Sequence, residues 1–552
     1  MAKYSVVVPT KSRADTLQHV LRNVLSSPRR DIEVVVHQCG ADAATDAVVA
    51  AVGDPRVRYF RTKESLPMRE NWERAVGESR GEFVTVIGDD DGIVPGAFEL
   101  ADALIAAHAP RLLTWRPVTY YWPTYFNPAL AGRAIYRYDI ASGNIRYSSA
   151  YALRWLYRFK WHYSDMPMIY NSFARRDLID SVRAARGRYF FLNSPDVTSG
   201  VVNASHSEDF LWSNYPLSIT GISKNSTGHR LVMQDDSRVK EGAMKEFMPA
   251  RVEQPWIAPG ANLDFGIAAE LLALREELGL EARGVTSSMQ GVAEYVARQL
   301  NQYPGQIGES RASLRAFCDR HGIDFNEIAA RFLLEAAPSR GPGGEAESES
   351  QVVMDRDLAQ SGDGDIHAAA QSIAACLGIP RPASVSRVGF AGEDGGSRDR
   401  AVLTFCHTGN AVQRLGDGWN RPEAFGAWAC DYRASVRIPV PTGASAEARV
   451  RIEIALRGPV IDAQSRFFYA VHVPRARAGL SREFSGERLS GTDILEIDVA
   501  ALGGDREVEV VFRCVDLVNT AVLGLGEDNR PLGTGLERIT VSTLPPRREG
   551  EA

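Results

Sequence analysis

The first 115 residues repeat one pattern, an apolar strand followed by a segment with helical spacing, and this repetition limits the fold most strongly. Alternating apolar residues indicate strands, and apolar residues three and four apart indicate helices. Repeated strand–helix units imply a mostly parallel sheet with helices on both faces, so we expect an α/β domain here. The expected strands are 4–8, 32–36, 56–60 and 83–87, and the expected helices are 16–25, 48–52, 69–79 and 95–107.

The fourth expected strand runs directly into three adjacent carboxylates, Asp89, Asp90 and Asp91. Unpaired charge is very costly to bury, so these residues belong outside a simple core. Just beyond the carboxyl end of a strand, they lie where open α/β sheets bind ligands. Hard oxygen ligands there suit Mg²⁺ or Mn²⁺, with a substrate phosphate completing the coordination. The alternative is a solvated acidic turn, since Asp is common in turns.

Four further polar segments accompany the acidic triplet. The first strand ends in Thr10–Arg13 with two cations, Arg69–Trp72 opens a helix, Asp196 opens a later helix, and Ser223–His229 forms a polar loop. A helix N-terminus favours phosphate, and His229 offers an imidazole metal ligand. Each has a plainer alternative: Asp196 as a helix cap, His229 as a surface residue, and Asn71 with Trp72 as helix packing.

Taken in order, Pro9-Thr10, Arg69–Trp72 and Gly81–Val84 leading into Gly88–Gly92 resemble the family-2 glycosyltransferases of the GT-A fold. The resemblance covers about residues 1 to 235. It implies that Asp91 is the principal ligand of a divalent cation, with Mn²⁺ or Mg²⁺ as the expected cofactor, and that Asp89 lies near the ribose and the donor sugar. His229, proposed above from its imidazole, is the second expected metal ligand. By resemblance Thr10, Arg13 and Asn71 line the nucleotide pocket, and we expect Pro9, Gln38, Asp89 and Asp90 to complete the nucleotide-sugar site.

The chain departs from the family pattern at two positions. An Asp usually ends the second strand and reads the nucleotide base, but Gln38 stands here, with Asp42 as a second candidate. An amide donates and accepts at a base edge, so binding is retained while the base identity is open. The acidic pair of the family's catalytic base is also missing at Asp196. We prefer Asp196 as the base over Asp209, since Glu208-Asp209 leads directly into an apparent strand.

The expected function is metal-dependent, inverting transfer of a hexosyl group from a nucleotide sugar, with a UDP-sugar as the expected donor, to a hydroxyl of a glycan, a lipid-linked acceptor or a protein. One carboxylate suffices as general base, because a nucleoside diphosphate leaves without a proton. Two alternatives remain: a non-catalytic sugar-binding or scaffold protein that retains the fold, and a nucleotidyltransferase. The intact acidic triplet favours the enzyme.

Beyond residue 235 the sequence pattern changes from helical to linker-like and then to strand-rich. We expect the GT-A domain at 1–235, a helical extension at 236–337, a flexible linker rich in Gly, Ser, Glu and Asp at 338–365, and an antiparallel β-sandwich at 366–548. In the last of these, Trp419 and Trp428 flank a Pro- and Gly-containing segment, which fits either a sandwich core or a carbohydrate platform, with the core preferred. An aromatic-rich stretch near 115–163 is either an acceptor wall or core over the cleft.

Composition limits the binding partners and the cellular compartment that we expect. A net charge of -6 gives no support for nucleic-acid binding, and 44% hydrophobic residues are ordinary for a globular protein. The six cysteines lack CxxC spacing, which predicts buried thiols in a reducing compartment. With no apolar run of membrane-spanning length, we expect a cytoplasmic enzyme, with peripheral attachment at the inner membrane face and homo-oligomerisation left open.

Overall fold

The structure is a computed structural model that divides into two compact units. The first comprises Met1–Glu345 and Ser350–Val385, and the second consists mainly of Ser386–Ala552. The described residues are 2–136, 144–159, 161–213, 215–226, 263–300, 307–333, 354–358, 364–377 and, beyond these, mostly strand segments between 385 and 545.

The centre of the first unit is a mostly parallel sheet with the order β9-β11-β6-β10-β4-β1-β2-β3. β1 pairs in parallel with β2 and β4, and β2 with β3, whereas β10 runs antiparallel between β4 and β6. This confirms the expected α/β fold. The strands are β1 (Tyr4–Thr10), β2 (Ile32–Cys39), β3 (Val57–Thr62), β4 (Phe83–Val86), β6 (Leu112–Trp115), β9 (Asn144–Ser148), β10 (Ser172–Arg175) and β11 (Asp209–Ser213).

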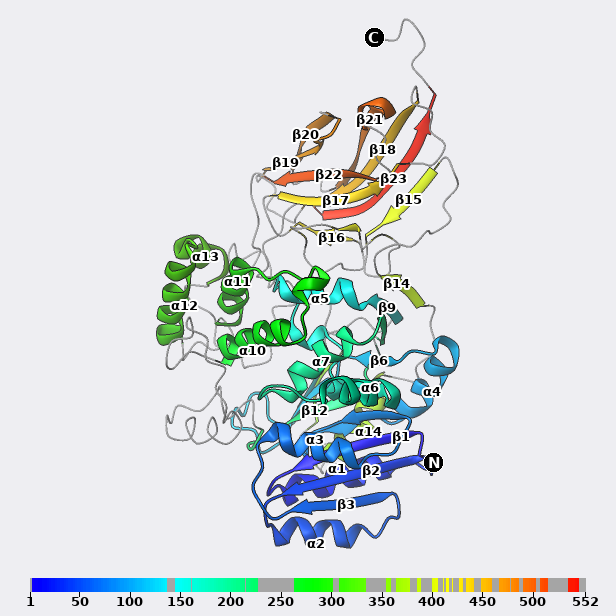
Figure 1. The fold of residues 1–552 in the computed structure, drawn as a ribbon, viewed down its shortest axis with the longest axis vertical. Coiled ribbons are helices and arrows are strands. Elements are labelled where there is room, and N and C mark those ends of the chain that lie inside the picture. Colours follow the sequence, from blue (N-terminus) through cyan, green and yellow to red (C-terminus); the bar gives the residue numbers. More distant parts are fainter. Residues whose placement is uncertain are drawn as a thin grey trace, which may run out of the picture. The chain divides into compact units, whose positions relative to one another are not determined.

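The repeated strand–helix units form as their spacing predicts. In α1 (Ala14–Leu25), Leu17, Val20, Leu21 and Val24 fall on one face and are buried against the sheet, as the helical period requires. Figure 1 shows β1, β2 and β3 side by side in blue, with α2 beside β3. The other helices of this part are α2 (Ala43–Val52), α3 (Met68–Glu78), α4 (Ala97–His108), α5 (Ser149–Tyr157), α6 (Arg176–Arg186) and α7 (Pro195–Ser205), with short 3₁₀ turns at Tyr163–Asp165 and Ile169–Asn171.

A second sheet lies beside the acidic triplet. Its order is β13-β8-β7-β12-β5, and β5 (Gly92–Ile93), directly after the triplet, pairs antiparallel with β12 (Ser218–Ile222). The remaining strands are β7 (Val118–Tyr121), β8 (Arg133–Tyr136) and β13 (Met354–Asp357). The sheet thus brings residues more than 100 positions apart to the carboxyl end of β4.

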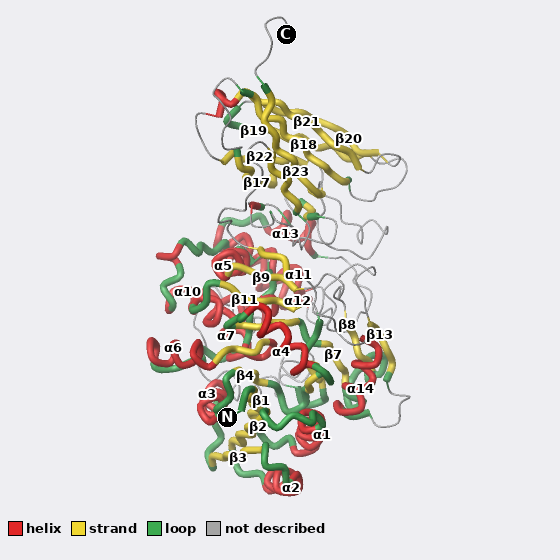
Figure 2. The backbone as a smooth tube through the Cα atoms, turned by 90° about the vertical axis from the view of Figure 1, so that its right-hand side faces the viewer, coloured by secondary structure: helices red, strands yellow, loops and turns green. Residues whose placement is uncertain are grey.

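A helical group follows in the sequence, as expected. It contains α10 (Leu263–Glu277), α11 (Met289–Leu300), α12 (Ile307–His321), α13 (Phe325–Phe332) and a 3₁₀ turn at Glu281–Arg283. Figure 2 shows α10, α11, α12 and α13 as red coils near α5 and α7. None of the helices in the described parts of the chain is long and apolar enough to cross a membrane.

The boundary between the two units differs from the one expected at 365/366. Residues 354–357 form β13, which pairs with β8, and residues 366–377 form α14 (Ile366–Leu377), which packs on α1. Ile366 and Ile373 are fully buried in the same core cluster as β1 and β2. The physical reason is that α14 has an apolar face, and the first unit buries it. The contact-based boundary therefore lies at Val385/Ser386.

The second unit consists of two antiparallel sheets, as the change in strand pattern predicts. One contains β15-β23-β18-β21 with β16 paired to β23, and the other contains β17-β22-β19-β20. In β18, buried and partly exposed residues alternate, so one face of its sheet is covered. The strands are β15 (Arg400–Thr404), β16 (Ala427–Trp428), β17 (Arg433–Pro439), β18 (Arg449–Arg457), β19 (Arg466–Val473), β20 (Ala478–Ser485), β21 (Ser490–Asp498), β22 (Glu507–Cys514) and β23 (Gly535–Leu544), with a 3₁₀ turn at Val499–Leu502; β14 (Val385–Val388) spans the unit boundary.

Trp419 is a core residue of the second unit. Its side chain is fully buried, its ring lies 5.2 Å from that of Phe512, and its Nε1 donates to the Ser435 carbonyl at 2.7 Å. A buried indole with a satisfied N–H contributes packing and has no free face for a sugar ring. The structural role preferred for this segment is confirmed at Trp419.

Candidate active site

The acidic triplet occupies the turn between β4 and β5 and is almost completely buried. The exposed fractions of Asp89, Asp90 and Asp91 are 4%, 5% and 1%. Gly221 of β12 makes this possible, because a Cβ there would meet the Asp90 carbonyl oxygen at 1.7 Å. A residue without a side chain lets the second sheet approach the turn this closely. The triplet is therefore an enclosed polar site and not a solvated acidic turn.

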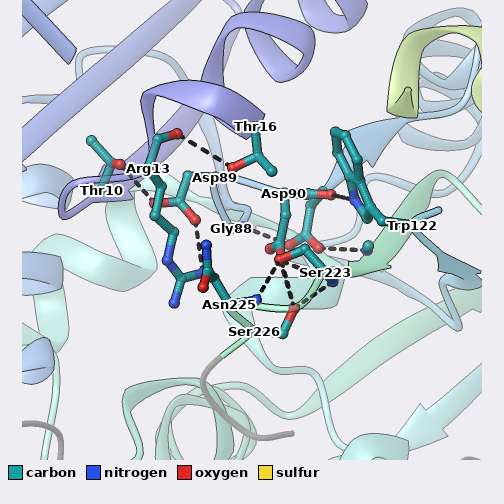
Figure 3. Close-up of polar contacts among 12 residues, drawn as sticks. Thr10, Arg13, Thr16, Gly88, Asp89, Asp90, Trp122, Ser223, Asn225 and Ser226 are labelled. Carbon is teal, nitrogen blue, oxygen red and sulfur yellow. Dashed lines mark hydrogen bonds and ion pairs between the residues drawn. The ribbon is translucent and has the colours of Figure 1, made fainter. Parts of the chain in front are cut away.

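Asp89 joins the triplet to the end of β1. Its carboxylate accepts a hydrogen bond from Thr10 Oγ1 at 2.6 Å and forms an ion pair with Arg13 at 3.1 Å (Figure 3). Burial raises the pKa of Asp89, and the nearby Arg13 guanidinium opposes this rise. Thr10 and Arg13 reach the triplet because β1 and β4 are parallel neighbours, so their carboxyl ends meet at one edge.

Asp90 joins the triplet to the polar loop after β12. One carboxylate oxygen accepts from Ser223 Oγ at 2.7 Å and from Ser226 Oγ at 2.5 Å, on the other side of the triplet from Arg13 (Figure 3). The Asp90 carbonyl accepts from Trp122 Nε1 at 2.9 Å. The serines are part of the loop singled out in the sequence; His229 of the same loop lies outside the described residues.

Asp91 is held by backbone donors from two strand ends. Its two carboxylate oxygens accept from the Gly221 amide at 2.8 Å and from the Gly88 amide at 2.5 Å. Burial and the charge of Asp90 raise the pKa of Asp91 to about 7, against the hydrogen bond that Tyr170 donates. Tyr170 stacks on Trp72, with ring centroids 6.3 Å apart. The Arg69–Trp72 segment therefore supports the acidic site, through a tyrosine that the sequence did not single out.

The donor set fits a divalent cation. Asp89 forms an ion pair with Arg13, whereas the carboxylates of Asp90 and Asp91 accept hydrogen bonds from hydroxyl and backbone amide donors. In the described part of the chain, no three His, Cys, Asp or Glu side chains are arranged to hold a metal ion by themselves. Mg²⁺ is usually bound through one or two carboxylates, with phosphate oxygens and water supplying the rest. Asp91, with Asp90 beside it, matches that arrangement.

The residues expected to bind the nucleotide lie at the same sheet edge, but most of their polar atoms already form hydrogen bonds with other protein groups. Gln38 is paired in register with Thr10, and its amide nitrogen donates to the Gly40 and Asp42 carbonyls at 3.1 and 3.3 Å. Its amide oxygen contacts the Tyr59 hydroxyl. Pro9 is buried within β1. In the structure, Gln38 braces the loop that follows β2.

Two neighbouring polar residues also have structural partners. Asn71 Oδ1 lies 2.6 Å from His37 Nδ1, and burial lowers the pKa of His37, so a neutral imidazole donates to the amide. Asp42 caps α2, accepting from the Ala44 amide at 3.2 Å and from Thr45 Oγ1 at 2.6 Å. Asp42 therefore serves as the helix cap that its position favours.

The two candidate bases lie at opposite edges of the main sheet. Asp196 is in the first turn of α7, and its charge helps raise the pKa of Tyr170, whose hydroxyl bonds Asp91. Asp209 begins β11, which runs parallel to β6 and hence to β4, so it lies at the amino edge. There it pairs with Arg146 at 2.7 Å. Only Asp196 of the two is near the acidic triplet.

The environment of Asp196 suits a proton acceptor. Burial raises the pKa of Asp196, and hydrogen bonds from the backbone amides of Val197 and of Asp196 itself oppose the rise. As a whole residue Asp196 is partly exposed, although its neighbours along α7 are buried. A carboxyl group whose pKa is raised at the edge of a ligand site is typical of general bases.

Most of the aromatic-rich stretch is core. Tyr120, Tyr121, Trp122 and Tyr125 are each at most 5% exposed, whereas Phe126 is 52% exposed. Trp122 supports the triplet through its bond to Asp90 and through an edge contact with His19. The wall of sugar-stacking rings considered from the sequence is thus not formed by these buried residues.

Comparison with known proteins agrees with this site. Residues 5–163 match the model of the family "Glycosyl transferase family 2". The chain is 30% identical over 100 residues to the GalNAc(5)-diNAcBac-PP-undecaprenol beta-1,3-glucosyltransferase of Campylobacter jejuni, covering 18% of this chain and 32% of that protein. It is 34% identical over 90 residues to the succinoglycan biosynthesis protein ExoO of Rhizobium meliloti, covering 16% and 26%.

This chain also aligns with solved structures of S. aureus TarS. The crystal structure of S. aureus TarS aligns over 99% of this chain and 97% of the TarS chain, at 10% sequence identity and a TM-score of 0.36. A shorter S. aureus TarS fragment in complex with UDP-GlcNAc aligns over 58% and 92%, at 15% identity and a TM-score of 0.34. The chain spans about a third or less of the two sequence relatives. The residues that match the model of glycosyl transferase family 2 thus include the strand–helix repeat and the acidic triplet that follows β4.

Proposed function

We propose that the chain is a glycosyltransferase that moves a sugar from a nucleotide sugar to an acceptor hydroxyl, with a divalent cation and inversion at the anomeric carbon. The observation that carries the proposal is the buried triplet Asp89–Asp91 at the carboxyl edge of the sheet, with Arg13 paired to Asp89 and Asp196 close enough to Tyr170, the partner of Asp91, to raise its pKa. A binding module has no need to enclose three adjacent carboxylates, since their burial is costly.

The chain's own residues divide the work of donor binding. Arg13 lies beside Asp89 at the end of β1, where its guanidinium neutralises charge on a bound diphosphate or on the triplet. Thr10 fixes the orientation of Asp89 through their 2.6 Å hydrogen bond. Asp89 would hold the donor sugar and its ribose, and Pro9, Gln38 and Asn71 are the residues proposed to line the nucleotide, Gln38 and Asn71 being held in place by their contacts with Tyr59 and His37.

Asp91 and Asp90 would hold Mn²⁺ or Mg²⁺, which when bound neutralises the diphosphate and stabilises it as a leaving group. Asp91 is oriented by two backbone amides and Tyr170, so its carboxylate is fixed before any ligand arrives. Preorganised charge of this kind is a main source of transition-state stabilisation. His229 lies outside the described residues and remains a proposed second ligand.

Asp196 accepts the proton of the acceptor hydroxyl. As the hydroxyl oxygen forms its bond to the anomeric carbon, the bond from that carbon to the diphosphate oxygen breaks, and the nucleoside diphosphate leaves with the electron pair. Attack from the face opposite the leaving group inverts the configuration. Asp209 is not proposed as the base, because it lies at the other edge of the sheet in an ion pair with Arg146.

The proposal is tested by incubating the purified chain with a panel of UDP-, GDP- and dTDP-sugars and measuring released nucleotide, with MnCl₂, MgCl₂ or chelator. Release from at least one donor, lost in chelator and in Asp91→Asn, is expected. Asp180→Asn is the matched control, because Asp180 is exposed on α6. Binding of a nucleotide sugar without any release, across glycan, lipid-linked and peptide acceptors, would instead indicate the sugar-binding alternative.

A further inference from the structure

The loop that leads into α7 is held by carboxylates from two other helices. Glu73 of α3 accepts from the Tyr189 and Phe190 amides at 3.0 and 2.8 Å. Glu270 of α10 accepts from the Asn193 amide at 3.3 Å, from Asn193 Nδ2 at 3.0 Å and from the Ser194 amide at 3.1 Å. The loop from 189 to 194 is therefore clamped at both ends by charge-assisted hydrogen bonds.

Between the two clamps the backbone is strained. Leu192 has φ +53°, in the left-handed region that residues with a side chain rarely adopt. Such a conformation persists only where the surroundings hold it in place, and it is typical of functional sites. Glu73 and Glu270 supply those surroundings on either side of Leu192. Once the clamp is released, the loop is expected to relax.

Glu270 is unusual because its carboxylate is almost completely buried. Its side chain is 2% exposed, and burial raises its pKa against the donors from Asn193 and Ser194. Ser194 is the N-cap of α7 and makes no side-chain cap to the helix, and its own backbone amide donates to Glu270. A negative group here is also favoured by the helix dipole. The hydrogen bonds that the Glu270 carboxylate accepts come from Asn193 and Ser194. Glu270 therefore holds the chain two residues before Asp196.

We propose that Glu270 is a positioning residue for Asp196, and that α10 thereby completes the active site. The inference rests on the proposed function, in which Asp196 is the base. It extends the site beyond the family-matched residues 5–163, to a helix about 100 residues further along the chain. Glu270 does not touch the substrate; it sets the direction in which the first turn of α7 presents Asp196 to the acceptor hydroxyl.

The test compares Glu270→Gln, Glu270→Ala and the control Glu276→Gln in the full chain, with the donor identified by nucleotide release. Glu276 is exposed on the same helix. A small misplacement of a catalytic group costs up to about 10²-fold in rate. We therefore expect kcat to fall about 10-fold in Glu270→Gln and about 100-fold in Glu270→Ala. Donor KM, and the binding of Mn²⁺ with UDP or GDP, should stay within about twofold, since the acidic triplet is untouched.

A second variant separates positioning from simple loss of structure. Glycine adopts the left-handed conformation without strain, so Leu192→Gly should restore about 3- to 10-fold of the kcat lost in Glu270→Gln. This readout remains available if Glu270→Ala does not fold. A Glu270→Gln enzyme with wild-type kcat, or one in which kcat and nucleotide binding fall together without rescue by Leu192→Gly, would overturn the inference.

The same assay keeps the two proposals apart. If wild type transfers sugar and Asp196→Asn does not, the function stands, whatever the Glu270 variants show. If wild type is active and Asp196→Asn is equally active, the base assignment fails and the role of Glu270 fails with it. A wild-type protein that releases nucleotide from no donor refutes the proposed function itself.

Discussion

Replacing Ile373 by Ala should destabilise the catalytic unit, although this residue lies more than 200 positions beyond the family match. Ile373 is on α14, is fully buried, and belongs to the core cluster that contains β1 and α1. The substitution removes three carbon atoms. At about 0.8 kcal/mol for each buried CH₂ this is roughly 2.4 kcal/mol. A cavity term adds to it, so we expect about 3 kcal/mol in total.

Hydrogen exchange in the full chain measures this loss of stability within the first unit. Amides of β1 lie in the centre of the sheet and exchange through unfolding of the whole unit. A loss of about 3 kcal/mol should speed their exchange by about 150-fold, since each 1.4 kcal/mol is tenfold. Gln371→Ala, on the exposed side of the same helix, should leave the rate unchanged, and so should a β18 peptide of the second unit in Ile373→Ala.

The result that refutes the reasoning is unchanged exchange of β1 in Ile373→Ala. It would mean that α14 is not part of the first core. The boundary would then return to about residue 365, as the sequence pattern suggested, and the segment 366–377 would belong with the β-rich unit.

Three further predictions concern the catalytic groups. Asp196→Asn should lower turnover about 10²-fold or more with nucleotide binding nearly intact, whereas Asp209→Asn should be harmless; the reverse order in the release assay would reassign the base. Burial raises the pKa of Asp196, and a base works only when deprotonated, so kcat should fall with decreasing pH along a limb above the ordinary Asp range; a limb at or below that range in the kcat–pH profile would contradict the burial argument. Tyr170→Phe removes the hydroxyl that bonds Asp91 and should weaken Mn²⁺–nucleotide binding by about tenfold or more, since a hydrogen bond to a charged group contributes about 1.5–3 kcal/mol and each 1.4 kcal/mol is tenfold; calorimetry showing unaltered affinity would remove Tyr170 from the site.

Local patterns in the sequence were sufficient for the catalytic fold. The strand–helix alternation before residue 115 predicts the parallel sheet, because each strand–helix unit is a local feature with its own period. The run from Val84 into Asp89–Asp91 places the acids at the carboxyl edge for the same reason. The position of Thr10 and Arg13 beside the acids follows from this, since β1 and β4 are neighbours in the sheet.

Contacts between distant segments were not predictable in this way. The pattern of 366–377 says that a helix has an apolar face but not which core covers it, so α14 was assigned to the wrong side of the boundary. Tyr170 and Glu270 act through single polar contacts that leave no periodic signal. The choice between Asp196 and Asp209 required the direction of β11, which depends on its pairing with β6.

The most direct test of the central claim is a measurement of Mn²⁺ bound to the chain in the presence of UDP or GDP, by electron paramagnetic resonance. Asp91 is the proposed ligand, and its carboxylate is fixed in place by Gly88, Gly221 and Tyr170. The account predicts one nucleotide-dependent Mn²⁺ in wild type, lost in Asp91→Asn and retained in Asp180→Asn. Equal Mn²⁺ binding by wild type and Asp91→Asn, or binding that ignores the nucleotide, would contradict it.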